Sequence, residues 1–289
     1  MVRVLFRRIH SGLLALFHSM ETKMKFLTLI SMLLSFSCLA QVQTINIGDF
    51  DLEYELLGSG KYIVLLEAGM TRDLSDWDTI LPDISKIARV IRYSRAGNGK
   101  SSKTTQQFSA EQYANHTKSL LDALKINEPV IHISHSYGGM LARAFAGQYP
   151  NSVNALLLID PSTEHDLDIV KRIDLPRAIK ETKWMKNIGL KNGMANEYLD
   201  YWAKRPMPNF VEIGDKPLTI IASIKKIDNP VVLQITDLGR EKMGDAHKVW
   251  AETFPQGKAV LTENSNHFIQ KEEPELVLKE LAELIGKLK

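Results

Sequence analysis

The stretch Val130-Ile131-His132-Ile133-Ser134-His135-Ser136-Tyr137-Gly138-Gly139 joins an apolar run to one central serine and two glycines. The β-branched residues at its start suit a short buried strand of a covered parallel sheet. Gly138 and Gly139 then open a helix. A serine on so tight a strand-to-helix turn has its hydroxyl pushed outward, and small residues two positions before and after it relieve the crowding. We therefore predict that Ser136 is a nucleophile.

The composition is that of a globular protein with a sizeable core. The 289 residues are 44% hydrophobic, and 36 basic residues stand against 34 acidic ones, for a net charge of +2. This length suits one large α/β domain, with or without an insertion. The balanced charge, with no basic run, argues against a nucleic-acid partner.

The N-terminal segment has the pattern of a leader. A basic start at Met24-Lys25 precedes the apolar run 27–34, and small residues follow up to Ala40. We therefore expect residues 1–40 to form a leader with a signal peptide, a true start at Met24, cleavage near Ala40 and export to the periplasm or the medium. The apolar run is too short for a stable membrane span. A membrane anchor is the alternative.

Cys38 is the only cysteine in the chain, and it would leave with the leader. A lipoprotein signal also places a cysteine at the cut, but Ser35 stands where such signals prefer an aliphatic residue. The mature chain would then hold no thiol, which excludes disulfides, a cysteine nucleophile and a thiolate metal site.

Beyond the leader, apolar runs alternate with helical patterns. Such alternation predicts an α/β fold in which a mostly parallel sheet of about eight strands is covered on both faces, after an antiparallel start. The interval 161–216 has helical stretches but no strand, and it is too long for a plain loop. The expected strands are 44–47, 51–57, 62–66, 89–93, 130–133, 155–159, 217–223 and 259–262.

From about Thr44 to its end, the chain resembles the α/β-hydrolase family. The turn around Ser136 is similar to the family's G-x-S-x-G elbow, with Ser134 in place of the first glycine. The run from Ser94 to Ser101 is similar to its D-R-x-G-x-G-x-S turn, with Ser94 in place of the aspartate. The resemblance implies a core of residues 41–160 and 217–289, with 161–216 as a helical cap over the active site. Ordinary packing of helices onto the core is the alternative for that interval.

The resemblance also implies the roles of a base and of an oxyanion hole. His267 follows the last strand in Asn266-His267-Phe268, where the family places its base. Glu67-Ala68-Gly69-Met70 matches an oxyanion loop, so the backbone N–H groups of Met70 and Tyr137 would hold the oxyanion. We expect His135 to point away across the elbow and to serve packing.

Two carboxylates are candidates for the acid of the triad. Asp160 ends an apolar strand and precedes Pro161, which restricts its backbone. Asp228 stands close to the place where other members carry the acid, but among Lys225, Lys226 and other polar residues typical of a solvated loop. We favour Asp160 and keep Asp228 as the alternative.

These residues favour acyl transfer. Ser136 would attack a carbonyl, His267 would take its proton, and water would later release the acyl group. We expect a serine esterase acting on a small-molecule acyl substrate, with no metal and no cofactor; amide, lactone and carbon–carbon hydrolysis stay open. The alternative is a receptor or binding protein of the same fold that keeps the triad. The oligomeric state cannot be inferred from the sequence.

Overall fold

The computed structural model describes residues 42–104, 106, 108–191 and 213–288. The chain divides into two units, residues 1–41 and Val42–Lys289. The predicted leader therefore lies outside the described residues, and the second unit holds the whole fold described below.

An eight-stranded sheet forms the centre of this unit, in the order β1-β2-β4-β3-β5-β6-β7-β8. The pairs β1–β2 and β2–β4 are antiparallel, and all the others are parallel. The predicted fold class, a mostly parallel sheet of about eight strands after an antiparallel start, is confirmed. The strands are β1 (Gln43–Asn46), β2 (Asp51–Leu57), β3 (Ile63–Glu67), β4 (Arg89–Tyr93), β5 (Val130–His135), β6 (Val153–Ile159), β7 (Leu218–Ser223) and β8 (Gly257–Thr262).

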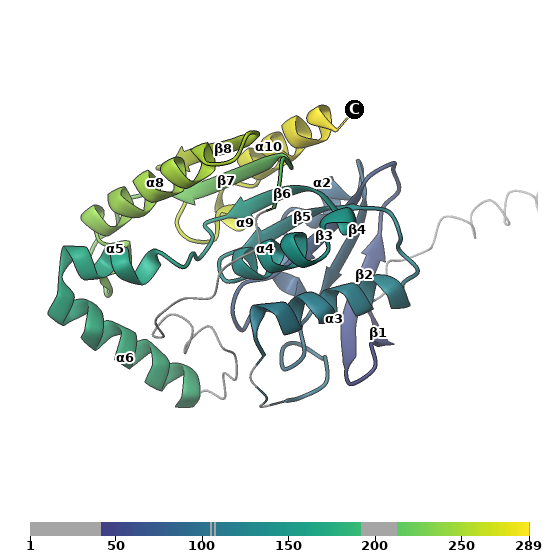
Figure 1. Cartoon of the computed structure of the whole chain (residues 1–289), viewed down its shortest axis with the longest axis horizontal. Coiled ribbons are helices and arrows are strands. Elements are labelled where there is room, and N and C mark those ends of the chain that lie inside the picture. The colour runs from purple at the N-terminus through teal and green to yellow at the C-terminus, as the bar shows by residue number, and fades with distance from the viewer. Residues whose placement is uncertain (1–41, 105, 107, 192–212, 289) are drawn as a thin grey trace, which may run out of the picture. The chain divides into compact units, whose positions relative to one another are not determined.

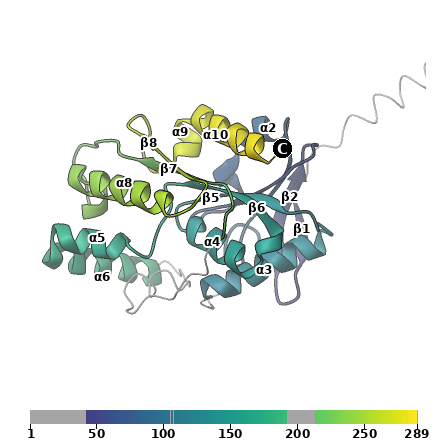
Figure 2. The same ribbon diagram turned by 45° about the horizontal axis from the view of Figure 1, so that its top comes forward.

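Helices cover both faces of the sheet, because alternate residues of each buried strand point to opposite sides. In β3, Leu65 belongs to the core cluster beneath α3, α4 and α8, whereas Val64 and Leu66 belong to the cluster beneath α2 and α10. Figure 2 shows these two sets of helices on opposite sides of the sheet. The helices are η1 (Leu74–Trp77), α2 (Leu81–Ile84), α3 (Ala110–Ala123), α4 (Gly138–Gln148), η2 (Pro150–Ser152), α5 (Asp166–Ile173), α6 (Leu175–Lys191), η3 (Leu233–Ile235), α8 (Asp237–Glu252), α9 (Ile269–Glu272) and α10 (Pro274–Lys287).

The segment between β3 and β4 has little helix. It contains the short 3-10 helix η1 and then the single turn α2. Asp73 caps η1, and Pro82 occupies the first turn of α2, where a missing N–H costs nothing. This arrangement buries Asp76 inside the fold, at 0% exposure.

The interval predicted to be a helical cap contains α5 and α6, which Figure 1 shows following β6. No strand occurs in the described residues of this interval, 161–191 and 213–216, and residues 192–212 lie outside the description. Leu167 and Val170 of α5 pack with Met243 of α8 in a third core cluster. Since α8 also covers the sheet, this cluster joins the inserted helices to the core.

Candidate active site

Ser136 lies on a sharp turn between β5 and α4. Its φ of 53° is in the left-handed region, which a residue other than glycine adopts only at some cost. Its N–H donates to the Ile159 carbonyl at 2.9 Å, and its carbonyl accepts from Gly139 at 2.9 Å. A Cβ on Gly138 would lie 2.6 Å from the Glu67 carbonyl oxygen, so this position requires glycine. The elbow is thus built from contacts with the two flanking strands.

His267 lies between Ser136 and Asp160. Its Nε2 is 3.0 Å from the Ser136 Oγ, and its Nδ1 is 2.6 Å from the Asp160 Oδ2. These three residues follow β8, β5 and β6, whose carboxyl ends meet at one edge of the parallel sheet. The arrangement links a hydroxyl, an imidazole and a carboxylate by hydrogen bonds, as nucleophilic catalysis by serine requires.

Asp160 has a strongly stabilised negative charge. Burial raises the pKa of its carboxyl. Hydrogen bonding and charge from His267, the charge of Arg240 and the hydrogen bond from the Ser223 N–H lower that pKa by more than burial raises it. The net pKa is therefore below its usual range. The Ser223 N–H donates at 2.9 Å, and Arg240 Nη1 lies 3.2 Å away. Asp160 therefore stays ionised at neutral pH, ready to orient an imidazole.

The backbone at Asp160 differs from the expectation drawn from Pro161. A residue before proline normally favours extended backbone, yet Asp160 has a φ of 41°, in the left-handed region. Its N–H donates to the Ile221 carbonyl, and its side chain accepts from Ser223, both on β7. These contacts hold the unusual backbone, so β7 positions the carboxylate more than Pro161 does.

Asp228, the alternative acid, is exposed in the loop between β7 and η3. Among the described carboxylates, that of Asp160 lies within hydrogen-bond distance of His267 Nδ1. The geometry thus favours Asp160 as the partner of His267.

A cavity of about 290 Å³ opens beside Ser136. Met70 lines it together with Ser136, and Tyr137, which follows the serine, is buried. Helices α5 and α6 contribute Asp166 and Met185, so the predicted cap interval forms part of its wall. The full lining is Met70, Ser136, Asp160, Pro161, Ser162, Asp166, Met185, Gln234, Ile235, Arg240, Met243, His247 and His267.

A buried polar network supports the loop that carries Met70. The Arg95 guanidinium pairs with the Glu67 carboxylate and donates to the carbonyls of Ala68 and Gly69, each at 2.6 Å. The Tyr93 hydroxyl also donates to Glu67. Burial raises the pKa of the Glu67 carboxyl, and Arg95 opposes that rise. Arg95 belongs to the run 94–101, which is similar to the family's D-R-x-G-x-G-x-S turn. That motif did not reveal that Arg95 donates to the carbonyls of the loop that carries Met70.

Two further carboxylates near the site could not be inferred from the sequence. Asp166, at 1% exposure, accepts from the Thr163 hydroxyl at 2.6 Å. Burial raises the pKa of Asp166 to about 7, and the negative charges of Glu164 and Asp160 add to this rise. Asp76 is buried beside His135. No local pattern marks either residue, because both environments form only when distant segments pack together.

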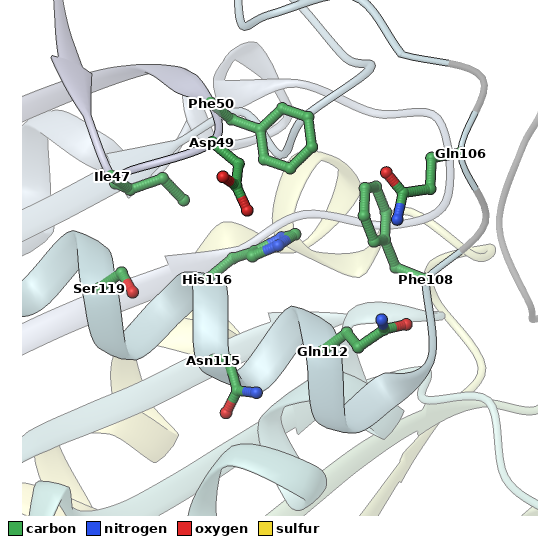
Figure 3. A pocket seen from close by; sticks show the side chains of 9 residues that line it. All are labelled: Ile47, Asp49, Phe50, Gln106, Phe108, Gln112, Asn115, His116 and Ser119. Carbon is green, nitrogen blue, oxygen red and sulfur yellow. The ribbon is translucent and has the colours of Figure 1, made fainter.

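A second cavity of about 360 Å³ shares no lining residue with the cavity at Ser136. Figure 3 shows its side chains, which come from the β1–β2 turn, the segment before α3, and α3 itself. Phe50, Phe108 and His116 meet there edge to face, with ring centroids 4.9 to 5.5 Å apart. Their mutual packing extends the core at this corner of the sheet.

In the part of the chain that the structure describes, no group of three or more histidine, cysteine, aspartate or glutamate side chains has the arrangement of a metal site. Within the same residues, no helix has both the length and the apolar character needed to cross a membrane.

Comparison with known proteins agrees with this architecture. Residues 62–177 match the model of the α/β-hydrolase fold family. The uncharacterized protein YqjL of Bacillus subtilis (strain 168) is 24% identical over 223 residues, which cover 76% of this chain and 82% of that protein. The 2-hydroxy-6-oxo-2,4-heptadienoate hydrolase of Pseudomonas putida (strain F1) is 29% identical over 116 residues, 39% of this chain and 41% of that enzyme.

Among solved structures, a thermophilic esterase from Thermogutta terrifontis superposes with a TM-score of 0.61 at 20% identity. The match covers 86% of this chain and 99% of the esterase. At this level of identity the similarity establishes the fold.

Proposed function

We propose that this chain, which has the α/β-hydrolase fold, is a serine hydrolase that cleaves a carboxylic ester or a related acyl compound. One observation carries the proposal: His267 lies 3.0 Å from the Ser136 hydroxyl and 2.6 Å from the Asp160 carboxylate. The serine stands on an elbow beside a cavity that admits a small molecule. Every group that the chemistry needs belongs to this chain.

The first half of the reaction forms an acyl-enzyme. Ser136 Oγ attacks the carbonyl carbon while His267 Nε2 takes the hydroxyl proton, and Asp160 stabilises the imidazolium through Nδ1. The backbone N–H groups of Met70 and Tyr137 hold the oxyanion of the tetrahedral intermediate. The intermediate then collapses, the alcohol leaves with the proton from His267, and the acyl group stays on Ser136.

The second half regenerates the enzyme. Water enters, gives one proton to His267 and attacks the acyl carbon. Collapse of the second intermediate breaks the bond to Ser136 Oγ, which recovers its proton from His267. The products are one carboxylic acid and one alcohol, and the water supplies the added hydrogen and hydroxyl.

The cavity favours a small substrate. Its volume of about 290 Å³ lies just below the range typical of ligand pockets, about 300–1,000 Å³. Its lining includes the apolar side chains of Met70, Met185 and Met243 and the polar side chains of Gln234 and Arg240. We expect esters with short acyl chains to be the best model substrates.

A covalent probe tests the proposal. A fluorophosphonate should label the wild-type chain and not Ser136→Ala, and mass spectrometry of the tryptic peptides should place the adduct on Ser136. In parallel, p-nitrophenyl acetate and butyrate should be hydrolysed by the wild type only. A labelled chain that turns over none of a panel of esters, lactones and amides would favour a receptor, and labelling that persists in Ser136→Ala would refute the proposed nucleophile.

A further inference from the structure

His135, the residue before the nucleophile, makes contacts that packing alone does not require. It is 1% exposed, and its two ring nitrogens contact two different segments. Nε2 lies 2.9 Å from the backbone carbonyl oxygen of His267, and Nδ1 lies 3.1 Å from the Asp76 Oδ2. A carbonyl oxygen and a carboxylate only accept hydrogen bonds, so the contact with His267 needs a hydrogen on Nε2 and the contact with Asp76 needs one on Nδ1. Both contacts form together in the doubly protonated ring. Burial lowers the pKa of the His135 ring, and the hydrogen bond and charge of Asp76 oppose that fall.

Asp76 is the anchor of this arrangement. Its carboxylate is 0% exposed and also contacts Lys271 Nζ at 2.9 Å and Arg72 Nε at 3.3 Å. Burial raises the pKa of the Asp76 carboxyl. Hydrogen bonding and charge from His135 and Lys271 lower it by more than burial raises it, so the net pKa is below its usual range. Asp76 is therefore an ionised, rigidly held acceptor for His135.

The same group of residues holds Phe268, the neighbour of His267. The Phe268 ring lies 5.1 Å from the His135 ring, and the cations of Arg72 and Lys271 lie 5.4 and 5.3 Å from its centre. Both cations also contact Asp76. The loop that carries His267 is thus held through its backbone and through its next side chain.

His135 also packs against the loop that leads to Met70. A Cβ added to Gly69 would lie 3.0 Å from His135 Nδ1, so the backbone of this loop passes close to the imidazole. One buried side chain therefore contacts the loop of the proposed base and the loop of the proposed oxyanion hole, and it is covalently adjacent to Ser136.

We propose that His135, oriented by Asp76, is a positioning residue that sets the distance between His267 and Ser136. The inference rests on the proposed function, because it concerns the geometry of that reaction. A carboxylate contacts Nδ1 of a histidine twice here, in Asp160 with His267 and in Asp76 with His135. In the second pair, the other ring nitrogen of His135 contacts the backbone carbonyl oxygen of His267. Misplacing a catalytic group by about 1 Å can cost about 100-fold in rate, so such a support has a measurable effect.

Two amide variants separate the two contacts of His135. In His135→Gln the amide nitrogen reaches the position of Nε2 and can donate to the His267 carbonyl. In His135→Asn the shorter amide reaches only the position of Nδ1, near Asp76. We expect His135→Asn to lower kcat for p-nitrophenyl acetate about 10- to 100-fold with little change in KM, and His135→Gln to retain most of the wild-type kcat.

Asp76→Asn tests the anchor, and Asp83→Asn is its control. Asp83 is an exposed acid of the neighbouring turn α2, where it pairs with Lys86. Asp76→Asn should lower kcat and slow the fluorophosphonate labelling of Ser136, whereas Asp83→Asn should change neither. Thermal unfolding of each variant shows how much of an effect comes from lost stability.

The outcomes separate this inference from the proposed function. A wild type that is neither labelled nor active would overturn the proposed function. An active wild type whose His135→Asn and His135→Gln variants have equal kcat would overturn the positioning role alone. Loss of kcat in strict proportion to the loss of folded protein would also overturn it, because His135 would then serve only stability.

Discussion

The guanidinium of Arg95 donates to the carbonyl oxygen of Gly69 across 2.6 Å, deep beneath the loop that carries Met70. Arg95 is 5% exposed and also pairs with Glu67, which ends β3. A planar, forked donor can hold a carboxylate and two carbonyls at once, which a lysine cannot do. The loop that carries Met70 thus takes its shape from an arginine that follows the neighbouring strand, β4.

Arg95→Lys should therefore lower kcat/KM for short esters by about 10- to 100-fold, because the Gly69 carbonyl loses its donor and the loop shifts. Steady-state kinetics with p-nitrophenyl acetate checks this. Arg89→Lys is the matched control, since Arg89 pairs with Glu128 at the surface, away from the loop. Unchanged kinetics in folded Arg95→Lys would mean that the loop holds its shape without the guanidinium.

Replacing the acid should separate the two candidate carboxylates. Asp160→Asn should reduce kcat by about four orders of magnitude, because an amide cannot stabilise the imidazolium of His267. Asp228→Asn should keep most of the activity, since Asp228 is exposed. Kinetics of both variants, with circular dichroism to verify folding, decides between them, and the reverse ranking would move the role of the acid to Asp228.

Gly138 should tolerate no side chain. In Gly138→Ala the new Cβ would lie 2.6 Å from the Glu67 carbonyl oxygen and 2.7 Å from that of Ala68, so the loop that carries Met70 must move. We expect a loss of about 1–3 kcal/mol in the free energy of unfolding, together with lower activity. Gly286→Ala, on an open face of α10, should instead gain about 0.5–1 kcal/mol. Urea denaturation of both variants measures these changes.

Asp166 should make the stability of the protein depend on pH near neutrality. Burial raises the pKa of this carboxyl to about 7 in the folded state, against about 3.9 in an unfolded chain. Between these values the folded state binds more protons than the unfolded state, so this group's contribution to stability falls as the pH rises from about 4 to about 7. The contribution of Asp166 to stability is fully present at pH values below its pKa in the unfolded chain, about 3.9.

Asp166→Asn removes this titration while keeping the shape of the neutral acid. We expect the stability of the variant relative to the wild type to rise by about 1–3 kcal/mol in the free energy of unfolding between pH 5 and pH 8. Denaturant titrations at both pH values test the difference. An equal gap at pH 5 and pH 8 would show that Asp166 does not titrate in this range.

The leader remains a prediction from the sequence. Expression in a bacterial host with an export pathway should yield a mature chain that begins near Gln41, because small residues follow the apolar run 27–34. N-terminal sequencing of the periplasmic or secreted material measures the cleavage site. A chain that keeps Met24 and stays in the cytoplasm would contradict the prediction.

The sequence by itself determined the sheet, the elbow at Ser136 and the order in which Ser136, Asp160 and His267 follow strands. These features are local: an apolar run of strand length, a glycine where a Cβ cannot fit, and a polar residue directly after a strand can be recognised within a few positions. The prediction of a mostly parallel sheet of about eight strands was therefore correct.

Only the tertiary structure decided which groups meet at the site. The contacts of His267 with Asp160 and Ser136 span 107 and 131 positions, and that of His135 with Asp76 spans 59. No local pattern encodes a distance between side chains on different strand ends, because that distance depends on how the whole sheet pairs and twists. For this reason His135 was predicted only to pack and Asp76 was not among the predicted site residues, although both lie buried against the segments that carry the site.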